Sequence, residues 1–503
     1  MSDENDIDVP DRIYDTYLGG TFFISGGSGF MGKTIIERLL RLLDVEKIYV
    51  LIRTKKDKPA RVRLEGIFTN ALFDVVRQLK GDRIFDKCIA ISGDITKDNL
   101  GLSEEDREIL KRDVDYVIHA AASVRFDEPL RSALLINTKG VLSMLQLARE
   151  MKSLKLFIHL STAFCHTDQK VLKEEFYRSK HDAKKLIGLA EMFDDATVES
   201  MRSVLVADVP NTYTFTKALG EDLIADVMDS LPVVMLRPSI VVPIWKDPIP
   251  GWNDNINGPM GMMAAAGKGV LRSMYGNKDA KADFVSADVA ADAVLVCSAY
   301  VLQNRNASRV YNICVGDELP VTWGGMIDLA RKIAMEKVPF DLILWAPGGK
   351  MRNSRISHYF MFALCQLLPA LLVDLIVPCF GYKPFLWKVQ MRIIYGQSVL
   401  DYYTSHEWVF DNSQSLKARS WMNKKELTRY TVTADGFDME KYIENGAMGM
   451  RRYLLKEPDE NLPKAKRTMK IMIGVDRVCN VLLKVLLAWL FYQWILLRIW
   501  SPR

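Results

Sequence analysis

One stretch decides the fold: Thr21-Phe-Phe-Ile-Ser-Gly-Gly-Ser-Gly-Phe-Met-Gly-Lys33. It predicts a short apolar strand over 22–24, a glycine turn, and a helix that begins near residue 30. Its glycines, Gly26, Gly29 and Gly32, have the spacing of a dinucleotide-binding turn. Glycine accepts the positive φ of a tight turn, and a diphosphate can then reach the N–H groups at the helix start. Taken alone, the turn also suits other α/β proteins.

Further apolar runs follow the turn and alternate with helical patterns such as 134–151. The runs rich in β-formers cover 47–52, 88–92, 114–119, 155–160 and 233–236. Strands that alternate with helices predict βαβ units and a parallel sheet. The predicted fold class is therefore α/β, a Rossmann-type doubly wound sheet with ligands at the carboxyl ends of its strands.

Composition limits the class of protein. A chain of 503 residues predicts more than one domain. A net charge of +5 from 67 basic and 62 acidic residues does not indicate a nucleic-acid binder. The seven cysteines are scattered and form no C-x-x-C pair, which argues against a disulfide framework and a zinc site and suits a reducing compartment. The acidic N-terminus does not resemble a secretory signal.

The chain is predicted to divide into consecutive segments. These are a polar leader at 1–20, a nucleotide-binding catalytic domain at 21–345, a mostly helical C-terminal domain at 346–460, a basic linker at 461–477 and a membrane anchor at 478–499. Residues 356–380 are densely apolar but contain Pro369, Asp374 and Pro378. Those interruptions favour a buried helical pair or a membrane-facing surface over a spanning helix.

The C-terminal run 478–497 carries a single charge, Lys484, and is rich in tryptophan. A membrane helix is the preferred interpretation, because a terminal apolar run of this length has few core partners. A helix lying in the interface or docked on the protein is the alternative. The basic segment 463–470 predicts that the preceding domains face the cytoplasm, although Arg498 and Arg503 on the far flank weaken this orientation.

The segment 211–221 carries the chemistry. Tyr213 and Lys217 are four residues apart, so on a helix they share a face. A nearby ammonium favours the phenolate and brings the tyrosine hydroxyl into a useful range for proton transfer. Ser161 and Thr162 end a predicted strand, where a hydroxyl can donate to a substrate carbonyl. The combination predicts a carbonyl reductase that needs no metal.

With these motifs the chain resembles the extended short-chain dehydrogenase/reductases and, more narrowly, the eukaryotic fatty acyl-CoA reductases of the insect type. The resemblance covers nearly the whole chain after residue 20. It is carried by 25–33, Leu51-Ile-Arg53, Gly93-Asp94, Ile118-His-Ala-Ala-Ala-Ser-Val-Arg-Phe-Asp127, Asn137-Thr-Lys-Gly140, Leu160-Ser-Thr-Ala-Phe164, the pair Tyr213 and Lys217, Leu236-Arg-Pro-Ser239, Gly381-Tyr-Lys-Pro384 and Tyr453-Leu-Leu-Lys-Glu457.

The resemblance implies a role for each matching residue. Tyr213 is expected to donate the proton, Lys217 to bind ribose and lower the tyrosine pKa, and Ser161 or Thr162 to orient the carbonyl. Asn137 is expected to hold a water that links Lys217 to solvent. Arg53 is expected to pair with the 2′-phosphate of NADPH. The other expected cofactor contacts are Gly26, Gly29, Phe30, Met31, Gly32, Asp94, Ile95, Ala120 and Ala121.

The activity that the resemblance implies is reduction of a long-chain or very-long-chain fatty acyl-CoA to a primary alcohol, with two NADPH and release of CoA. The expected partners are the acyl-CoA and a lipid bilayer, without nucleic acid or metal, and a homo-oligomer stays open. Endoplasmic reticulum is the first expectation for location, with peroxisome and lipid droplet as alternatives. The competing hypotheses are a related reductase acting on a sterol or fatty aldehyde, and a silent NADP-binding membrane scaffold.

The chain also departs from the family pattern. Ser25 and Ser28 replace threonines, and His166 replaces an asparagine near the expected active site. The run 283–292 differs on the substrate side. None of these changes alters the serine, tyrosine and lysine set.

Other polar residues have a structural interpretation. His119 and His159 are expected to be core histidines, the latter with satisfied hydrogen bonds, and Arg237 to close the sheet rather than bind phosphate. Cys165 has no evident base beside it, which disfavours a nucleophile. Arg125 and Asp127 are expected to form an ion pair, with a role in the substrate pocket as the alternative.

Overall fold

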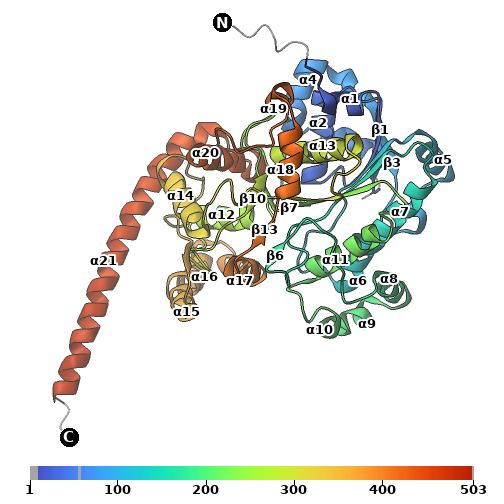
Figure 1. Cartoon of the computed structure of the whole chain (residues 1–503). Coiled ribbons are helices and arrows are strands. Elements are labelled where there is room, and N and C mark those ends of the chain that lie inside the picture. The colour runs from blue at the N-terminus through green and yellow to red at the C-terminus, as the bar shows by residue number, and fades with distance from the viewer. Residues whose placement is uncertain (1–8, 55–57, 501–503) are drawn as a thin grey trace. The chain divides into compact units, whose positions relative to one another are not determined.

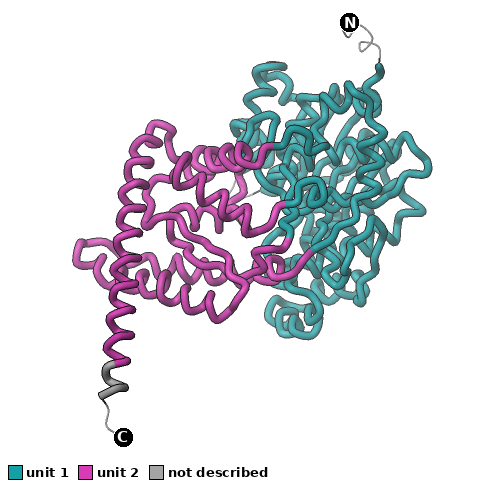
Figure 2. The backbone as a smooth tube through the Cα atoms, turned by 60° about the vertical axis from the view of Figure 1, so that its left-hand side comes forward, with its two compact units in different colours: residues 1–252, 281–320, 408–437 teal, residues 253–280, 321–407, 438–503 magenta. Residues whose placement is uncertain are grey.

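The computed structural model describes residues 9–54 and 58–500. The chain forms two compact units that interleave along the sequence (Figures 1 and 2). Unit 1 contains residues 1–252, 281–320 and 408–437, and unit 2 contains residues 253–280, 321–407 and 438–503. The sequence predicted consecutive domains with a boundary at residue 345. In the structure, unit 1 also contains residues 408–437, which lie beyond that boundary.

Unit 1 is built on a seven-stranded sheet in the order β11-β7-β5-β4-β1-β2-β3 (Figure 1). All neighbouring strands are parallel. The strands are β1 (Thr21–Ser25), β2 (Lys47–Ile52), β3 (Cys88–Ser92), β4 (Tyr116–His119), β5 (Leu156–Leu160), β7 (Val233–Pro238) and β11 (Val310–Ile313). The strand order reverses between β1 and β4, which defines the ligand-binding crevice of a doubly wound sheet.

The predicted fold class is confirmed by this sheet. The first six strands in sequence lie where the apolar runs predicted them, because strands buried on both faces are continuously apolar. β11 was not predicted from the sequence. Two short parallel pairs accompany the sheet, β6 (Val171–Leu172) with β13 (Val409–Phe410) and β8 (Ile240–Val242) with β10 (Phe284–Ser286).

Helices pack around the sheet of unit 1. They are α1 (Arg12–Tyr17), α2 (Phe30–Leu42), α3 (Ala60–Phe68), α4 (Asp74–Lys80), α5 (Glu104–Asp113), α6 (Leu130–Ala133), α7 (Gly140–Glu150), α8 (Ala183–Met192), α9 (Asp195–Ser200), α10 (Arg202–Leu205), α11 (Thr212–Ala225), α13 (Ala287–Gln303), α18 (Ser413–Trp421) and α19 (Lys424–Arg429). Apolar residues of α7 and α11 join those of the central strands in one large core. α2 packs against α13.

The predicted polar leader is partly ordered structure. Residues 1–8 lie outside the described residues, but 12–17 form α1, whose Ile13 and Tyr17 are buried. The Tyr17 hydroxyl donates to the Leu295 carbonyl at 2.9 Å, and Arg12 pairs with Glu426 at 2.7 Å. The leader therefore belongs to the packed body of unit 1 from this point on.

Unit 2 is mostly helical, as predicted for the C-terminal part. Its helices are α12 (Pro259–Gly267), α14 (Trp323–Glu336), α15 (Arg355–Phe362), α16 (Leu368–Ile376), α17 (Leu386–Ser405), α20 (Met439–Gly449) and α21 (Leu462–Trp500). One short parallel pair joins β9 (Ser273–Tyr275) to β12 (Lys350–Arg352). An apolar cluster around Met260, Phe340, Met450 and Met469 forms one core of the unit.

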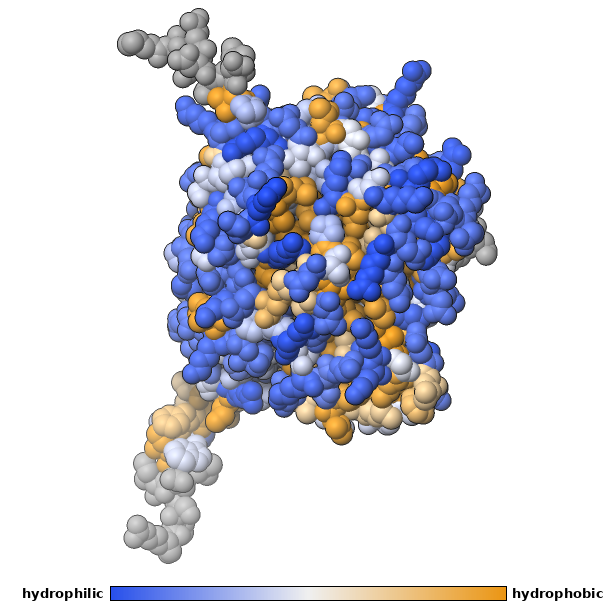
Figure 3. Space-filling model, turned by 45° about the vertical axis from the view of Figure 1, so that its right-hand side comes forward, coloured by the Kyte–Doolittle hydropathy of each residue, from blue (hydrophilic) through white to orange (hydrophobic). Residues whose placement is uncertain are grey.

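The C-terminal segment is a single helix, α21, of 39 residues. The predicted linker at 461–477 is thus almost entirely the first part of this helix, because no residue between 464 and 500 breaks helical geometry. Apolar side chains from Val478 to Trp494 are exposed on it, and Figure 3 shows such side chains on the projecting helix next to the grey terminus. Its role as an anchor stays a prediction.

Candidate active site

The glycine turn after β1 is shaped so that only glycine fits. Gly26 has φ of +80°, and a Cβ there would lie 2.6 Å from the backbone of Ala120 and Ala121. A Cβ at Gly32 would overlap the carbonyl oxygen of Gly26. The third glycine therefore packs on the turn itself rather than on the strand. The turn brings its backbone against the end of β4, as the cofactor-binding prediction requires.

The N-terminus of α2 faces this turn and lacks a side-chain cap. Its N-cap residue is Gly29, which leaves the N–H groups of the first turn open to an anion. Phe30 and Met31 are half-buried, and the Phe30 ring stacks on Trp252 with centroids 5.5 Å apart. These features fit the diphosphate of a dinucleotide, because N–H groups and a helix dipole both favour negative charge.

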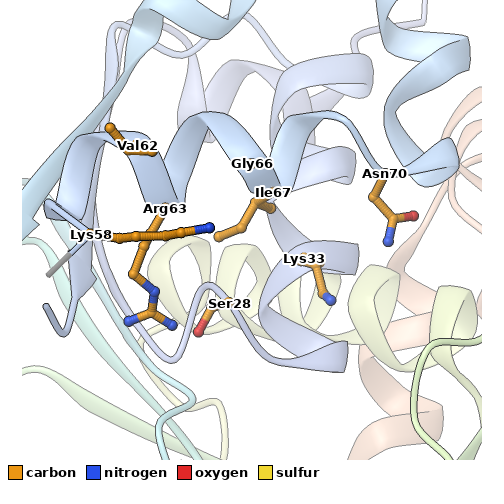
Figure 4. A pocket seen from close by; sticks show the side chains of 8 residues that line it. All are labelled: Ser28, Lys33, Lys58, Val62, Arg63, Gly66, Ile67 and Asn70. Carbon is orange, nitrogen blue, oxygen red and sulfur yellow. The ribbon is translucent and has the colours of Figure 1, made fainter. Parts of the chain in front are cut away.

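A basic pocket of about 410 Å³ adjoins the glycine turn (Figure 4). It is lined by Ser28, Lys33, Lys58, Val62, Arg63, Gly66, Ile67 and Asn70. Burial lowers the pKa of Lys33. Of the lining residues, sequence reasoning noted only Ser28 and Lys33, as members of the glycine motif. Lys58 and Arg63 lie on the segment after β2, where no motif marks them.

Arg53 follows β2 at the same edge of the sheet. Its side chain is 61% exposed, and its Nη1 lies 4.0 Å from Asp94 Oδ2. Arg63 donates a hydrogen bond to the Arg53 carbonyl, which connects Arg53 to the basic pocket. An exposed guanidinium without a short ion pair among the described residues is available to a bound phosphate.

Asp94 and Ile95 differ in their surroundings. Asp94 Oδ1 accepts from the backbone and hydroxyl of Thr96, at 3.0 and 2.9 Å, and closes a turn after β3. Ile95 is buried in the main core and packs against Gly140. Asp94 therefore lies at the predicted edge, whereas the Ile95 side chain serves packing, so only its backbone can face a ligand.

α11 carries Tyr213 and Lys217 on one helix, as their spacing predicted. The helix begins after Asn211, whose side chain accepts from Thr214 N at 2.9 Å. Tyr213 is half-buried, with its ring 5.5 Å from that of Phe126. Proton transfer by a tyrosine in this position depends on the charge one helical turn away.

Lys217 supplies that charge. Its side chain is buried, and Nζ donates to the Leu160 carbonyl at the end of β5, at 2.6 Å. Burial lowers the pKa of Lys217 to about 8, against the opposing effect of Glu221. Burial thus brings the pKa of this ammonium nearer to neutrality while the group is held at the carboxyl edge of the sheet.

Asn137 connects the loop after β4 to the helix α11. It lies in a π-helical turn, 134–139, that precedes α7. Its Oδ1 accepts from Ser123 N at 2.8 Å, and its Nδ2 donates to Ser123 O and to Thr216 Oγ1, at 3.1 and 3.0 Å. Both amide hydrogens are therefore used to tie the loop after β4 to α11. Its predicted link through water to Lys217 stays a prediction.

Ser161 and Thr162 follow β5 and are both buried, but their hydroxyl groups differ. Ser161 Oγ donates to the Glu221 carboxylate. Thr162 Oγ1 accepts from Phe164 N at 3.3 Å, and among the described residues no acceptor takes its own hydrogen. The Thr162 hydroxyl is therefore the one that remains able to donate to a carbonyl.

Glu221 is the centre of a buried polar network that sequence reasoning missed. Arg237 donates to both carboxylate oxygens, at 2.9 and 2.6 Å, and His166 Nε2 lies 2.8 Å from Oε2. Cys165 Sγ lies 3.0 Å from Oε1. The only signal in the sequence was the position of Glu221, one helical turn beyond Lys217. Its partners come from 16 to 60 residues away.

The charges in this network support one another. Burial would raise the pKa of Glu221, but Arg237 and His166 hold it well below its usual value. Although burial opposes its charge, Cys165 and Glu221 raise the pKa of His166 to about 10. Cys165, His166 and Glu221 bring potential metal-ligand atoms within 4.8 Å, but Arg237 already engages both carboxylate oxygens. The geometry is that of an ion-pair cluster behind the Ser161 turn.

Most of the other polar residues singled out in the sequence have structural partners. Arg237 is an internal ion-pair partner rather than a phosphate ligand, and Arg125 pairs with Asp127 at 3.0 Å. His119 is buried, its Nδ1 lies 2.6 Å from Ser25 Oγ, and burial lowers its pKa to about 3. His159 is buried, but neither ring nitrogen has a hydrogen-bond partner among the described residues, so the expected satisfaction is wrong.

The divergent run 283–292 is structural. Asp288 accepts from the backbone N–H groups of Trp245 and Lys246, at 3.0 and 2.8 Å. Asp292 pairs with the buried Arg38 at 3.0 Å. These carboxylates stabilise the beginning of α13 and its contact with α2.

Together, the parallel sheet, the open helix N-terminus and the tyrosine and lysine of α11 define a nicotinamide-dependent reductase of the Rossmann type. The solved structures support this fold. The terminal R domain of the myxalamid PKS-NRPS pathway is similar with a TM-score of 0.59 at 18% identity, covering 88% of this chain and 93% of that one. The R domain of a non-ribosomal peptide synthetase from Mycobacterium tuberculosis is similar with a TM-score of 0.57 at 17% identity, covering 89% of this chain and 96% of that one.

Sequence comparison narrows the class. A family model described as "Male sterility protein", of the NAD-binding type, matches residues 24–294, and a second with the same description matches 365–457. Fatty acyl-CoA reductase 1 of Rattus norvegicus is 35% identical over 95% of this chain and 92% of its own length. Fatty acyl-CoA reductase wat of Drosophila melanogaster is 32% identical over 93% and 91%. The chain belongs to the fatty acyl-CoA reductase family.

Proposed function

We propose that this protein reduces a long-chain fatty acyl-CoA to the primary alcohol and releases free CoA, with NADPH as the reductant. The observation that carries the proposal is Tyr213 on the same helix as a buried Lys217, at the sheet edge that also bears the uncapped glycine turn. Family membership supports the acyl-CoA as substrate. A reduced nicotinamide bound at this edge supplies one hydride for each of the two reductions.

The side chains act on the charge that develops at the carbonyl. When a hydride adds to the thioester carbon, the carbonyl oxygen becomes an oxyanion, which Tyr213 and Thr162 can stabilise by hydrogen bonds. The C–S bond then breaks, the CoA thiolate leaves and takes up a proton, and an aldehyde remains. Addition of a second hydride to the aldehyde carbon, with a proton from Tyr213, completes the alcohol.

We assign the carbonyl-orienting role to Thr162 rather than Ser161. The Ser161 hydroxyl hydrogen is used by Glu221, so a substrate carbonyl would have to compete with a buried carboxylate. Thr162 lies next to it in the chain and keeps its hydroxyl hydrogen for a ligand. Lys217 is proposed to hold the nicotinamide ribose and to assist proton loss from Tyr213.

The preference for NADPH over NADH is proposed from charge. Arg53, Lys58 and Arg63 surround the edge where the adenosine end of a dinucleotide would lie. A 2′-phosphate adds two negative charges there, and guanidinium groups bind phosphate by paired, charge-assisted hydrogen bonds.

We further propose that the protein is membrane-associated, with α21 as an anchor and the catalytic unit on the cytoplasmic side. The endoplasmic reticulum is the first expectation, and the exposed apolar side chains of α21 support an anchor. An acyl chain favours apolar surroundings by about 0.8 kcal/mol per methylene group, so an enzyme held at a membrane is close to its substrate pool.

The test is an assay of membranes containing the full chain with palmitoyl-CoA, or a very-long-chain acyl-CoA, and NADPH. We expect fatty alcohol and free CoA from the wild type and no alcohol above background from Tyr213→Phe. Reduction of a fatty aldehyde without reduction of acyl-CoA would favour the related lipid reductase. Binding of NADPH without turnover of either substrate would favour the silent scaffold.

A further inference from the structure

An apolar helical run in unit 2 buries two of its polar side chains and exposes most of its large apolar ones. The run comprises α15, a π-helical turn at 363–367, α16 and a 3₁₀ turn at 377–380, after which Gly381 reverses the chain into α17. Among the described residues, Arg355–Phe380 is the only helical run long and apolar enough to cross a membrane. Length and composition alone do not say whether it does.

The inner face of the run is attached to the unit and carries two polar residues, His358 and Gln366, beside the apolar Phe362 and Ala370. His358, Phe362, Gln366 and Ala370 are all buried, and their spacing of four residues places them on one face over about 18 Å. Gln366 Oε1 accepts from the backbone of Arg272 at 2.9 Å, and its Nε2 donates to Gln390 Oε1 of α17 at 2.6 Å.

A second contact fixes the start of the run. The ring nitrogen Nδ1 of His358 lies 3.0 Å from Ser273 Oγ, which is itself buried in β9. Gln390 also donates to the Val270 carbonyl at 3.3 Å. Hydrogen bonds made in the interior thus hold the run against the body of unit 2 at His358 and at Gln366.

The outer face of the run is apolar and uncovered. Exposed fractions reach 84% for Ile356, 64% for Phe360, 65% for Leu375 and 73% for Phe380. Helices of proteins surrounded by water bury their apolar face and expose their polar one. This run instead exposes its large apolar side chains and buries two polar ones, an arrangement that a medium without water on the outer face would stabilise.

The flanks of this face suit the headgroup region of a bilayer. Tyr382 and Trp387 are exposed at the turn, and aromatic residues of this kind concentrate at membrane interfaces. Lys383, Lys388 and Arg392 are exposed beside them. Asp374 is the single acidic residue between 353 and 400.

Asp374 closes the turn internally. Its carboxylate accepts from the backbone N–H groups of Phe385, Leu386 and Trp387, at 3.0, 3.0 and 2.8 Å. These hydrogen bonds lower its pKa although burial opposes them. The charge is therefore used to cap the N-terminus of α17, and the exposed surface around it carries only positive charges for anionic headgroups.

We propose that residues 355–392 form a monotopic membrane contact: the run lies in the plane of one leaflet, with its apolar face among the acyl chains and its basic flank at anionic headgroups. It does not span the bilayer, because a spanning helix would have to give up the hydrogen bonds of His358 and Gln366. The contact is separate from α21 and does not depend on the reductase activity.

The test measures depth in the full chain on vesicles of phosphatidylcholine and phosphatidylserine. Cys379 is exposed in the 3₁₀ turn and can carry an environment-sensitive fluorophore once Cys365→Ser and Cys479→Ser remove the other accessible thiols. We expect quenching by a spin label near the headgroup to exceed quenching by one at the bilayer centre by about twofold or more. A label at Lys184→Cys on α8, with Cys379→Ser, is the matched control and should not be quenched.

Charge on the outer face sharpens the test. Leu375→Glu with Ile376→Glu should reduce quenching of the Cys379 label by at least about half, since charges avoid the acyl region. The substituted side chains are exposed, so the fold should tolerate them, and Leu79→Glu at an exposed site in α4 should change nothing.

Other outcomes would overturn the proposal. Stronger quenching from the bilayer centre would indicate a spanning helix. Absence of quenching on vesicles, or absence of vesicle binding, would indicate that protein or water covers the face. Shielding that appears in nanodiscs with two copies of the chain but not in nanodiscs with one would identify a second copy as the cover.

Discussion

Both α11 and the α15–α16 run place side chains where a protein in water would not normally place them. Charged side chains are usually exposed to water and large apolar ones are usually buried. α11 buries two opposite charges, Lys217 and Glu221, within the core of unit 1. The α15–α16 run exposes leucine, isoleucine and phenylalanine on the surface of unit 2. In the first case the chain itself supplies every compensating partner. In the second we propose that a membrane supplies the compensation, so the comparison sets a proposed catalytic interior against a proposed contact surface.

The largest expected effect concerns the internal partners of α11. Arg237→Met removes the cation that engages both oxygens of Glu221, and both side chains are fully buried. Removing one partner of a buried ion pair costs about 3–5 kcal/mol. We expect a clear fall in the unfolding temperature, measured by calorimetry or by fluorescence. In the double variant Arg237→Met with Glu221→Leu, part of the stability should return; a single variant as stable as the wild type would refute the internal compensation.

A smaller effect separates the two hydroxyl groups after β5. Thr162→Val should lower kcat by about 100-fold, the usual cost of one donor to a developing oxyanion. Ser161→Ala should lower it by less than about 10-fold, because Ser161 serves the Glu221 network. Steady-state rates of alcohol formation measure both. The reverse order would return the carbonyl-orienting role to Ser161.

A further prediction concerns Arg53 at the cofactor edge of the sheet, whose side chain makes no short ion pair with the described residues. Arg53→Ala should raise KM for NADPH by about 10-fold and leave KM for NADH nearly unchanged, since a charge-assisted hydrogen bond is worth about 1.5–3 kcal/mol. Arg61→Ala, at an exposed site of α3 paired with Glu65, is the control. Equal changes for the two cofactors would contradict the 2′-phosphate role.

The smallest expected effect is the pH dependence caused by Lys217. Its pKa is lowered by burial from 10.5 to about 8. The catalytic ammonium should therefore lose its proton above about pH 8, and kcat/KM should fall there by several-fold per pH unit. Lys217→Arg keeps its charge and should move this limb to higher pH. If the alkaline limb of the kcat/KM profile stays at the same pH in Lys217→Arg, the titration belongs to another group.

The same shift has a consequence for stability. Because the folded pKa lies below the unfolded one, the unfolded state binds more protons between about pH 8 and 10.5. The contribution of Lys217 to the free energy of unfolding should therefore rise with pH across that window. Below about pH 8, where the buried side chain is charged, it should destabilise the folded state to its full extent. Comparing unfolding of the wild type with Lys217→Met across the window would isolate this contribution.

Local patterns were sufficient to predict the sheet and the edge where the site lies. Apolar runs located six strands, and the parallel arrangement placed Arg53, Asp94 and Ser161 at one edge. The spacing of Tyr213 and Lys217 correctly predicted a shared helix.

Long-range contacts were beyond such patterns. The partners of Glu221 come from β7 and from the loop after β5, and nothing near Glu221 in sequence marks them. The interleaving of the two units could not be predicted from local sequence patterns either. Residues 408–437 join unit 1 through packing, and no motif marks them. For 355–380, composition revealed the apolar content, but only the structure assigned the polar residues to the inner face.

The most direct measurement of the central claim uses NADPH carrying deuterium at the transferable position of the nicotinamide. The full chain in membranes is supplied with unlabelled palmitoyl-CoA, and the alcohol is analysed by mass spectrometry. We expect an alcohol with two deuterium atoms on its first carbon, and no labelled alcohol from Tyr213→Phe. An alcohol with a single deuterium, or labelled alcohol formed equally by Tyr213→Phe, would contradict the proposed function.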